Sequence, residues 1–155
     1  MVKNDTQKTE EKQEKVVIYA RVSTPKQKDD LDRQASRLEG FCAARGMIVA
    51  KTVKEIASGL NDHRTKLTAI LQDKSITTIV VEHKDRLTRF GFNYISNLLA
   101  CDGRSILVIN DSESKDQDLM QDFVSIITSM AARVYGTRRS KRKTQEIISV
   151  VSNVS

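Results

Sequence analysis

Apolar segments alternate with segments of helical periodicity along the chain as far as residue 109. The apolar segments predict strands that are covered on both faces, and they lie at residues 16–19, 48–53, 78–81 and 106–109. Between them, apolar positions recur at helical spacing within residues 31–42, 67–71 and 94–99. This alternation predicts an α/β fold with a mostly parallel central sheet and helices on both faces.

A longer helical pattern without proline follows, from about residue 117 to residue 148. Phe123, Ile127, Met130 and Val134 form one apolar stripe, and neighbouring apolar residues widen it beyond a single face. An arc this broad needs more cover than the helix's own sheet provides. The helix is either fully buried in its own domain or packed in part against a partner subunit. We favour the second interpretation, a long C-terminal oligomerisation helix.

The remaining segments set the domain limits. Residues 1–14 hold one apolar residue beyond the initiator and predict a charged linker or tail. Residues 15–148 then form a single domain, and residues 149–155 form a short tail. No apolar run is long enough to span a membrane, and the polar N-terminus does not resemble a signal peptide.

Charge and cysteine content indicate the kind of binding partner and the cellular compartment. The net charge of +6 favours a polyanionic partner such as nucleic acid. Cys42 and Cys101 lie far apart in apolar helical surroundings, so we expect two buried thiols in a reducing compartment and no disulfide. These features predict a cytoplasmic protein.

Polar residues follow three successive predicted strands. In chain order they are Arg21, Ser23, Ser58, Arg64, Asp85, Arg86 and Arg89. Ligands of parallel sheets bind beyond the carboxyl ends of the strands, so these side chains are expected to converge. Each feature has a structural alternative: a helix cap at Ser23, a turn at residues 58–59, or a surface ion pair between Asp85 and Arg86. Because all three strands end this way, a common site is the stronger interpretation.

The residue types favour chemistry on phosphorus. Arginine is permanently charged and forks onto phosphate oxygens, and a serine hydroxyl among arginines is a credible nucleophile. A serine hydrolase is disfavoured because the only histidines are His63 and His83 and no G-x-S-x-G motif occurs. No P-loop motif and no dense carboxylate or His/Cys cluster occurs either, so we expect neither a metal nor a cofactor.

Several motifs, taken in order, resemble the serine recombinases of the resolvase/invertase family. They are residues 19–24 with Gln27, residues 31–34, Ser58-Gly59 with Arg64, and residues 85–89. The resemblance covers about residues 15–145 and implies a resolvase-like fold. It also implies that Ser23 attacks a DNA phosphodiester, giving a 5′-phosphoserine link and a free 3′-hydroxyl.

The family resemblance assigns further roles. Arg21, Arg86 and Arg89 would clamp the phosphate with Arg64 and Gln27 alongside, and Asp85 would orient arginines or help to move the proton. Further DNA contacts would come from Tyr19, Ser58, Arg138, Arg139, Lys141, Arg142 and Lys143. The basic residues at 138–143 have an alternative interpretation, which is a solvated face near a helix C-terminus.

The implied partner is double-stranded DNA, bound by a homodimer that assembles to a homotetramer on two DNA sites. No metal, ATP or other small-molecule cofactor and no membrane is implied, and the expected location is the cytoplasm, associated with the nucleoid.

The chain also departs from the common resolvase pattern. Residues 134–136 read Val-Tyr-Gly where resolvases and invertases typically carry Glu-Arg, and only a short tail follows the long helix. Residues 132–136 and the following basic run resemble a subgroup of insertion-sequence transposases, which place a MerR-like DNA-binding domain before the catalytic domain. Glu55 fits an acidic position that is common in the family. We therefore expect the catalytic domain of a serine transposase, with residues 1–14 as the interdomain linker. The alternatives are a resolvase/invertase-type recombinase and a catalytically silent DNA-binding or dimerisation module.

Overall fold

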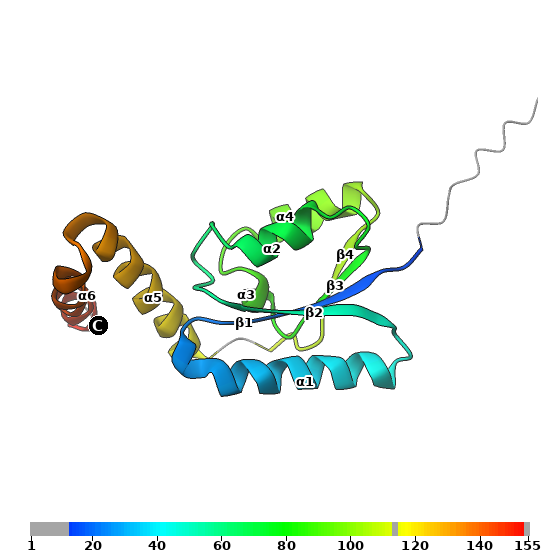
Figure 1. Ribbon diagram of the computed structural model, residues 1–155, viewed down its shortest axis with the longest axis horizontal. Coiled ribbons are helices and arrows are strands. Elements are labelled where there is room, and N and C mark those ends of the chain that lie inside the picture. The colour runs from blue at the N-terminus through cyan, green and yellow to red at the C-terminus, as the bar shows by residue number, and fades with distance from the viewer. Residues whose placement is uncertain (1–12, 113–114, 154–155) are drawn as a thin grey trace, which may run out of the picture.

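Four parallel strands form a single sheet at the centre of the molecule (Figure 1). The computed structural model describes residues 13–112 and 115–153. The strands are β1 (Val16–Val22), β2 (Val49–Ile56), β3 (Thr78–Val81) and β4 (Ser105–Val108). Their order across the sheet is β2-β1-β3-β4, and every neighbouring pair is parallel. The predicted α/β fold with a parallel sheet is therefore confirmed.

Helices cover both faces of this sheet. Helix α1 (Lys28–Ala44) lies on one face, and α2 (Thr65–Gln72) and α4 (Phe92–Cys101) lie on the other (Figure 1). The short elements η1 (Pro25–Gln27) and α3 (Lys84–Leu87) follow β1 and β3. Helices α5 (Asp116–Tyr135) and α6 (Thr137–Ser152) extend beyond the end of the sheet (Figure 1).

Strand β1 is the core of the fold because all seven of its residues are buried. Alternate residues, beginning with Val16 and Ile18, pack toward α1 against residues such as Leu38. The others, Val17 and Tyr19, pack in a second cluster with residues of α2 and α4. Arg21 therefore continues the side of β1 that faces α2 and α4, at the strand's carboxyl end.

The strand register brings the polar strand ends together. Arg21 pairs with Glu55 and Val22 pairs with Ile56 along the β1–β2 ladder. The amide of Ala57 then donates to the carbonyl of Val22 over 3.0 Å, which keeps the following loop against β1. Parallel pairing thus places the segments after β1 and β2 at the same edge of the sheet, as expected from the sequence.

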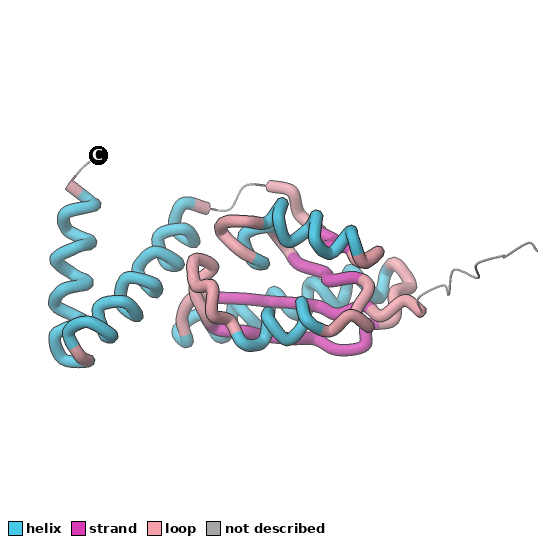
Figure 2. Tube along the Cα trace, turned by 90° about the horizontal axis from the view of Figure 1, so that it is seen from above, coloured by secondary structure: helices cyan, strands magenta, loops and turns pink. Residues whose placement is uncertain are grey.

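The C-terminal helical region is two helices, so the prediction of one helix over residues 117–148 was wrong. Gly136 separates α5 from α6 with φ = +77°, in the left-handed region that favours glycine. Helix α6 also continues to Ser152, into the segment that was expected to be a tail. The two helices meet at an angle at one end of the molecule (Figure 2).

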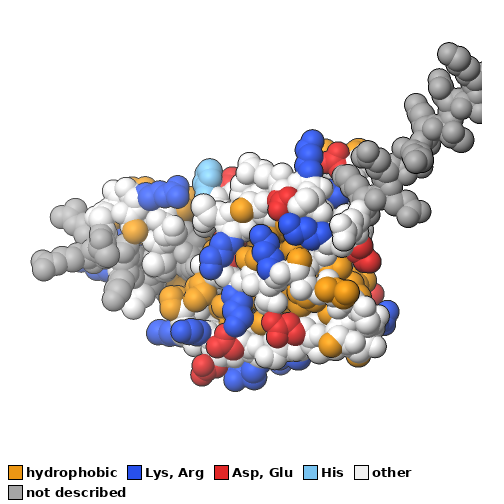
Figure 3. Space-filling view, turned by 45° about the vertical axis from the view of Figure 1, so that its right-hand side comes forward, with side chains coloured by type: hydrophobic (Ala, Val, Ile, Leu, Met, Phe, Trp, Pro, Cys, Tyr) orange, Lys and Arg blue, Asp and Glu red, His pale blue; other side chains and the backbone are white. Residues whose placement is uncertain are grey.

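The two cysteines differ in exposure. Cys42 is buried as expected, but Cys101 is exposed, which corrects that prediction. Within the described residues, no helix combines the length and the apolar character needed to cross a membrane. On the face shown in Figure 3, Lys and Arg side chains lie among acidic and hydrophobic ones, so the positive charge does not form one patch there.

Candidate active site

A buried carboxylate, that of Asp122 in α5, lies at the centre of the predicted site. The Arg21 guanidinium donates from Nη1 to Oδ1 over 2.6 Å and from Nη2 to Oδ2 over 3.1 Å. Arg89 Nε donates to Oδ2 over 2.6 Å, and the Gly59 amide donates to Oδ1 over 3.0 Å. The Ser23 hydroxyl also donates to Oδ1. Asp122 thus joins the ends of β1 and β2 and the segment after α3.

Electrostatics keep this carboxylate ionised. Burial alone would raise the pKa of Asp122, but the hydrogen bonds and charge of Arg21 outweigh burial. Hydrogen bonds from Ser23 and Gly59 act in the same direction, so the pKa lies far below the ordinary aspartate value. Arg21 is itself fully buried, and an isolated buried guanidinium would cost several kcal/mol. Asp122 supplies the charge that offsets it.

Backbone carbonyls hold the rest of the Arg21 guanidinium. Its Nε donates to the carbonyl of Arg86 over 3.0 Å, and its Nη1 donates to the carbonyl of Ala57 over 3.0 Å. Its Nη2 donates to the carbonyl of Asp85 over 2.5 Å. Arg21 therefore fixes the position of the segments after β2 and β3 relative to β1.

Ser23 lies beside this guanidinium, on the turn between β1 and η1. Its amide donates to Gln27 Oε1 over 3.2 Å, and its carbonyl accepts the Ser125 hydroxyl from α5 over 3.2 Å. Thr24, not Ser23, occupies the N-cap position of η1. The helix-cap interpretation of Ser23 was therefore wrong, and its hydroxyl faces the Asp122 carboxylate.

The residues of α3 and the following turn complete the cluster. Arg89 Nη1 donates to Asp85 Oδ2 over 2.9 Å, and Arg86 pairs with Asp118 of α5 over 3.3 Å. The alternative of an ion pair between Asp85 and Arg86 is thus replaced by two other pairs. Among the described residues, Asp85 Oδ1 and Arg86 Nε are buried without a hydrogen-bond partner. Such groups are rare in folded proteins, and a catalytic role is one of their recognised explanations.

Arg64 belongs to a separate buried cluster with Tyr19 and Glu55. Tyr19 donates its hydroxyl proton to Glu55 Oε1 over 2.8 Å, and Arg64 Nη1 donates to the same hydroxyl oxygen over 3.3 Å. Burial lowers the pKa of Arg64 and raises the pKa of Tyr19. Glu55 also accepts the amides of Lys66 and Leu67 at the start of α2.

This cluster corrects the expected role of Tyr19. Its side chain is fully buried below the sheet surface, so it cannot contact DNA in this structure. Its hydrogen bonds instead connect β1 to Glu55 in β2 and to Arg64 at the N-cap of α2. Tyr19 therefore holds Arg64 and Glu55 together inside the core.

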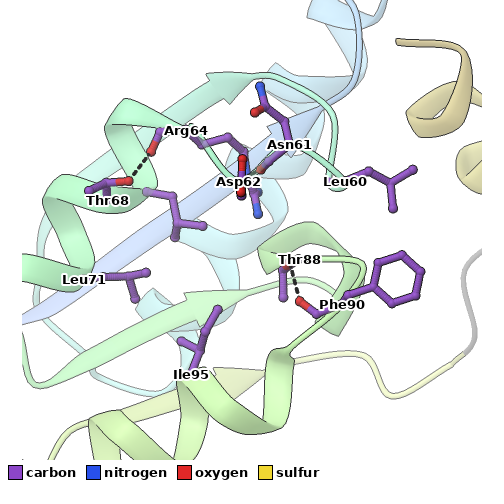
Figure 4. A pocket seen from close by; sticks show the side chains of 11 residues that line it. Leu60, Asn61, Asp62, Arg64, Thr68, Leu71, Thr88, Phe90 and Ile95 are labelled. Atoms are coloured by element: carbon purple, nitrogen blue, oxygen red, sulfur yellow. Dashed lines mark hydrogen bonds between the residues drawn. The ribbon is translucent and has the colours of Figure 1, made fainter. Parts of the chain in front are cut away.

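A cavity of about 280 Å³ lies beside Arg64 (Figure 4). Leu71 and Ile95 line its apolar end, whereas Phe90 at its rim points away from it (Figure 4). The Thr68 hydroxyl, which also lines the cavity, donates to the carbonyl of Arg64 over 2.7 Å. Arg64 therefore borders an open space between α2 and the segment before α4. Gly59 also lines this space, and its amide donates to Asp122, so the cavity lies next to the Asp122 cluster.

Other expected DNA contacts are placed differently. Ser58 is buried and donates its hydroxyl proton to the backbone carbonyl of Asp122 over 2.7 Å, so it attaches α5 to the loop after β2. Arg142 and Lys143 lie on α6 and pair with Glu146 over 3.4 and 3.2 Å. The side chains of Arg138, Arg139 and Lys141 lie outside the described residues.

Sequence reasoning missed Asp122 and the Gly59 amide. Asp122 lies between Gln121 and Phe123 in a predicted oligomerisation helix, so nothing in its local pattern connects it with the strand ends. The Gly59 amide was missed because the sequence identifies the glycine but not the group that its amide contacts. The available hint was that Asp122 is an acidic residue next to the apolar stripe of that helix.

Comparison with known proteins gives a consistent result. Residues 16–149 match the family model described as Resolvase, N terminal domain. The C-terminal catalytic domain of ISC1926 TnpA, an IS607-like serine recombinase, is 40% identical with a TM-score of 0.69, over 89% of this chain and 99% of that one. The corresponding domain of IS1535 TnpA, also IS607-like, is 39% identical with a TM-score of 0.70, over 88% and 98% of the two chains.

Curated relatives give the same picture at lower identity. A protein of Acanthamoeba polyphaga mimivirus that is named as a resolvase is 30% identical over 87% of this chain and 71% of its own length. An uncharacterized protein of Mycobacterium tuberculosis is 35% identical over 89% of this chain, but over only 46% of its own length. The chain therefore spans about half the length of the mycobacterial relatives that it matches.

Proposed function

The chain belongs to the resolvase N-terminal domain family as a serine recombinase catalytic domain, and from this premise we propose that it cleaves and rejoins DNA through a covalent bond to Ser23. The observation that carries the proposal is the meeting of the Ser23 hydroxyl with Arg21 and Arg89 at a single anion-binding point. Guanidinium groups around a hydroxyl suit attack on a phosphodiester, whose transition state spreads negative charge over the phosphoryl oxygens.

The proposed cleavage step exchanges one ester for another. The Ser23 Oγ forms a bond to phosphorus while the bond from phosphorus to the 3′ oxygen breaks. The serine hydroxyl loses its proton and the departing 3′ oxygen gains one. The products are a 5′-phosphoserine link and a free 3′-hydroxyl, and attack by a 3′-hydroxyl on the same phosphorus reverses the step. Because the ester bond is retained, rejoining needs no external energy source.

Each neighbouring residue has a role in this proposal. Arg21 and Arg89 bind the phosphoryl oxygens, with Arg86 completing the clamp through its unpaired Nε. Asp85 orients Arg89 through their hydrogen bond of 2.9 Å. Gln27 fixes the Ser23 backbone by accepting its amide.

A transposase is the favoured physiological role. The two solved catalytic domains that are 40% and 39% identical are both described as IS607-like serine recombinases from TnpA proteins. The sequence departs from the resolvase pattern at residues 134–136 in the direction expected for insertion-sequence transposases. Double-stranded DNA is the proposed substrate, and paired cleavage would require two or more copies of this chain.

A cleavage assay tests the proposal. The protein is incubated with a supercoiled plasmid that carries the genomic DNA flanking its own gene, and the products are separated on a denaturing gel. We expect strand breaks accompanied by a covalent protein–DNA band. The Ser23→Ala variant should lose this band completely, because it has no hydroxyl to form the ester.

The matched control is Ser112→Ala, which removes an exposed serine hydroxyl after β4 and should keep the band. Circular dichroism establishes that both variants are folded. A band that persists in Ser23→Ala would show that another residue is the nucleophile. Retarded but uncleaved DNA with both wild-type and Ser112→Ala protein would instead favour a silent DNA-binding module.

A further inference from the structure

The groups that surround the Asp122 carboxylate form a site for an oxyanion. Arg21 and Arg89 donate three hydrogen bonds at 2.6, 3.1 and 2.6 Å, and the Gly59 amide adds a fourth at 3.0 Å. Paired guanidinium groups and a backbone amide are donors that phosphate oxygens use in proteins. The hydroxyl of Ser23 donates to Oδ1 of the same carboxylate.

The site is built tightly around its anion. A Cβ atom at Gly59 would lie 2.7 Å from Arg21 Nη2 and 2.9 Å from Asp122 Oδ2. It would also lie 2.9 Å from Arg89 Cγ. No side chain larger than hydrogen fits at this position without displacing the donors, so the glycine serves the close approach of its amide to the anion.

A phosphodiester cannot use these donors while Asp122 holds them. The side chains of Arg21 and Asp122 are both fully buried, and that of Arg89 is only 7% exposed. The carboxylate also neutralises part of the positive charge that would attract a phosphate. A second anion at this point would have to displace the carboxylate or be repelled by it.

We propose that Asp122 is an internal competitor for the scissile phosphate, which holds the catalytic residues in a closed state until α5 withdraws. This inference rests on the proposed function, since it assigns a regulatory contact to the same site. Withdrawal of α5 removes the carboxylate from Arg21 and Arg89 and frees the Ser23 hydroxyl in the same movement. One displacement therefore exposes both the anion site and the nucleophile.

Two further hydrogen bonds attach α5 to this edge of the sheet. The Ser58 hydroxyl donates to the Asp122 carbonyl over 2.7 Å, and the Ser125 hydroxyl donates to the Ser23 carbonyl over 3.2 Å. Farther along α5, Met130 and Val134 are exposed, at 56% and 72%. A second copy of this chain that bound these exposed side chains could draw α5 away from the sheet, which would link opening of the site to assembly.

A role for Asp122 as the proton acceptor of Ser23 agrees less well with its surroundings. Hydrogen bonds from guanidinium groups stabilise the ionised form and make the carboxylate a weak base. A weak base contributes little to deprotonating a hydroxyl, whereas a stable carboxylate is a strong competitor for an anion site.

Inorganic phosphate tests the proposal without DNA. Titration calorimetry is carried out on wild-type protein and on Asp122→Asn, which keeps the shape of the side chain but removes its charge. We expect Asp122→Asn to bind phosphate at least about tenfold more tightly than wild-type, because the anion no longer competes with a charged carboxylate for the guanidinium donors. A tenfold change in Kd corresponds to about 1.4 kcal/mol.

The matched control is Asp116→Asn, which removes the same charge from an exposed position in the first turn of α5. This variant should bind phosphate as weakly as wild-type. Equal phosphate affinity in folded Asp122→Asn and Asp116→Asn would overturn the proposal.

A second variant decides the matter if Asp122→Asn does not fold. Ser58→Ala keeps the carboxylate but removes the hydrogen bond that attaches α5 at Asp122, so it should shift the closed state toward the open one. We expect a phosphate affinity higher than that of Asp116→Asn, and an unchanged affinity would contradict the proposal.

The outcome is separable from that of the proposed function. Tighter phosphate binding by Asp122→Asn together with absent DNA cleavage would retain the internal competitor and remove the recombinase chemistry. Cleavage by wild-type protein with no gain of phosphate affinity in Asp122→Asn would retain the recombinase chemistry and remove the internal competitor.

Discussion

The hydroxyl of Ser23 and the guanidinium groups of Arg21 and Arg89 meet at a carboxylate that comes from a distant part of the chain. Asp122 is 99 residues from Ser23 in sequence, yet it accepts hydrogen bonds from all three side chains. A carboxylate held in this way stabilises the folded protein only while it is ionised. Acid therefore provides a direct probe of this contact.

We expect the free energy of unfolding of wild-type protein to fall as the pH drops below about 4, the ordinary pKa of aspartate. The pKa of Asp122 is lowered in the folded state, so its stabilising effect is complete above the ordinary value and is lost as the pH falls toward the folded-state pKa. Asp122→Asn lacks this ionisable group, so its free energy of unfolding should change less than that of wild-type between about pH 5 and about pH 2.5. Urea unfolding followed by circular dichroism measures the difference. Asp116→Asn should retain the wild-type acid dependence, and an equal slope in the two variants would contradict the assignment.

At the scale of single residues, the sequence predicted the strand-end set but not its organisation. Arg21, Ser23 and Arg89 converge because parallel strands deliver their carboxyl ends to one edge. Arg64 separates from them because its guanidinium reaches the hydroxyl of Tyr19 inside the core. Asp122 could not be predicted because its position depends on how α5 packs against the sheet, which no local pattern encodes.

At the scale of elements, the break between α5 and α6 is the feature that local periodicity did not reveal. Residues 137–146 contain neither proline nor glycine, so nothing beyond Gly136 itself marked an end to the predicted helix. Gly136 alone interrupts it, with φ = +77° and ψ = 164°. A single glycine is tolerated in many helices, at a cost of about 1 kcal/mol relative to alanine, so its presence does not predict a break.

Gly136→Ala should favour a continuous helix from α5 into α6. Alanine disfavours this backbone conformation, by about 1 to 3 kcal/mol, and it has a higher helix propensity than glycine. Spin labels at Met120→Cys and Val150→Cys, in a Cys101→Ser background, report the change by electron–electron resonance. A continuous helix separates these positions by about 45 Å, from about 1.5 Å of rise per residue.

The labelled protein is diluted into unlabelled protein so that only distances within one chain are measured. The variant with Gly136 should give a shorter distance than Gly136→Ala. An identical distance distribution in the two proteins would show that packing between α5 and α6, and not the glycine, sets the bend.

At the scale of the whole molecule, α5 and α6 project from the sheet and its covering helices (Figure 1). Exposed apolar side chains are found along both helices. They are Leu119, Met120, Met130, Val134, Tyr135, Ile147, Val150 and Val151. Exposed apolar surface of this extent is typical of interaction sites. The sequence predicted such a surface from the width of the apolar arc, although it could not place the surface beyond the end of the sheet.

We therefore expect wild-type protein to form at least a dimer at high concentration, through α5 and α6. Val134→Glu places a charge on the exposed side of α5 and should shift the protein toward monomer, because burying that charge in an interface is costly. Size-exclusion chromatography with light scattering measures the molar mass. Ile48→Glu is the control, since Ile48 is 89% exposed but precedes β2 and lies outside these helices. A strictly monomeric wild-type protein would contradict the expectation.

The central claim is that Ser23 becomes esterified to a DNA 5′-phosphate, and mass spectrometry of the covalent complex tests it most directly. The complex formed on the plasmid is digested with nuclease and protease, and the peptides are sequenced by fragmentation. The account predicts a 5′-phosphonucleotide attached to the peptide that contains Ser23, with the added mass located on that serine. A nucleotide attached to Ser58, Tyr94 or any other residue, with the Ser23 peptide unmodified, would contradict it.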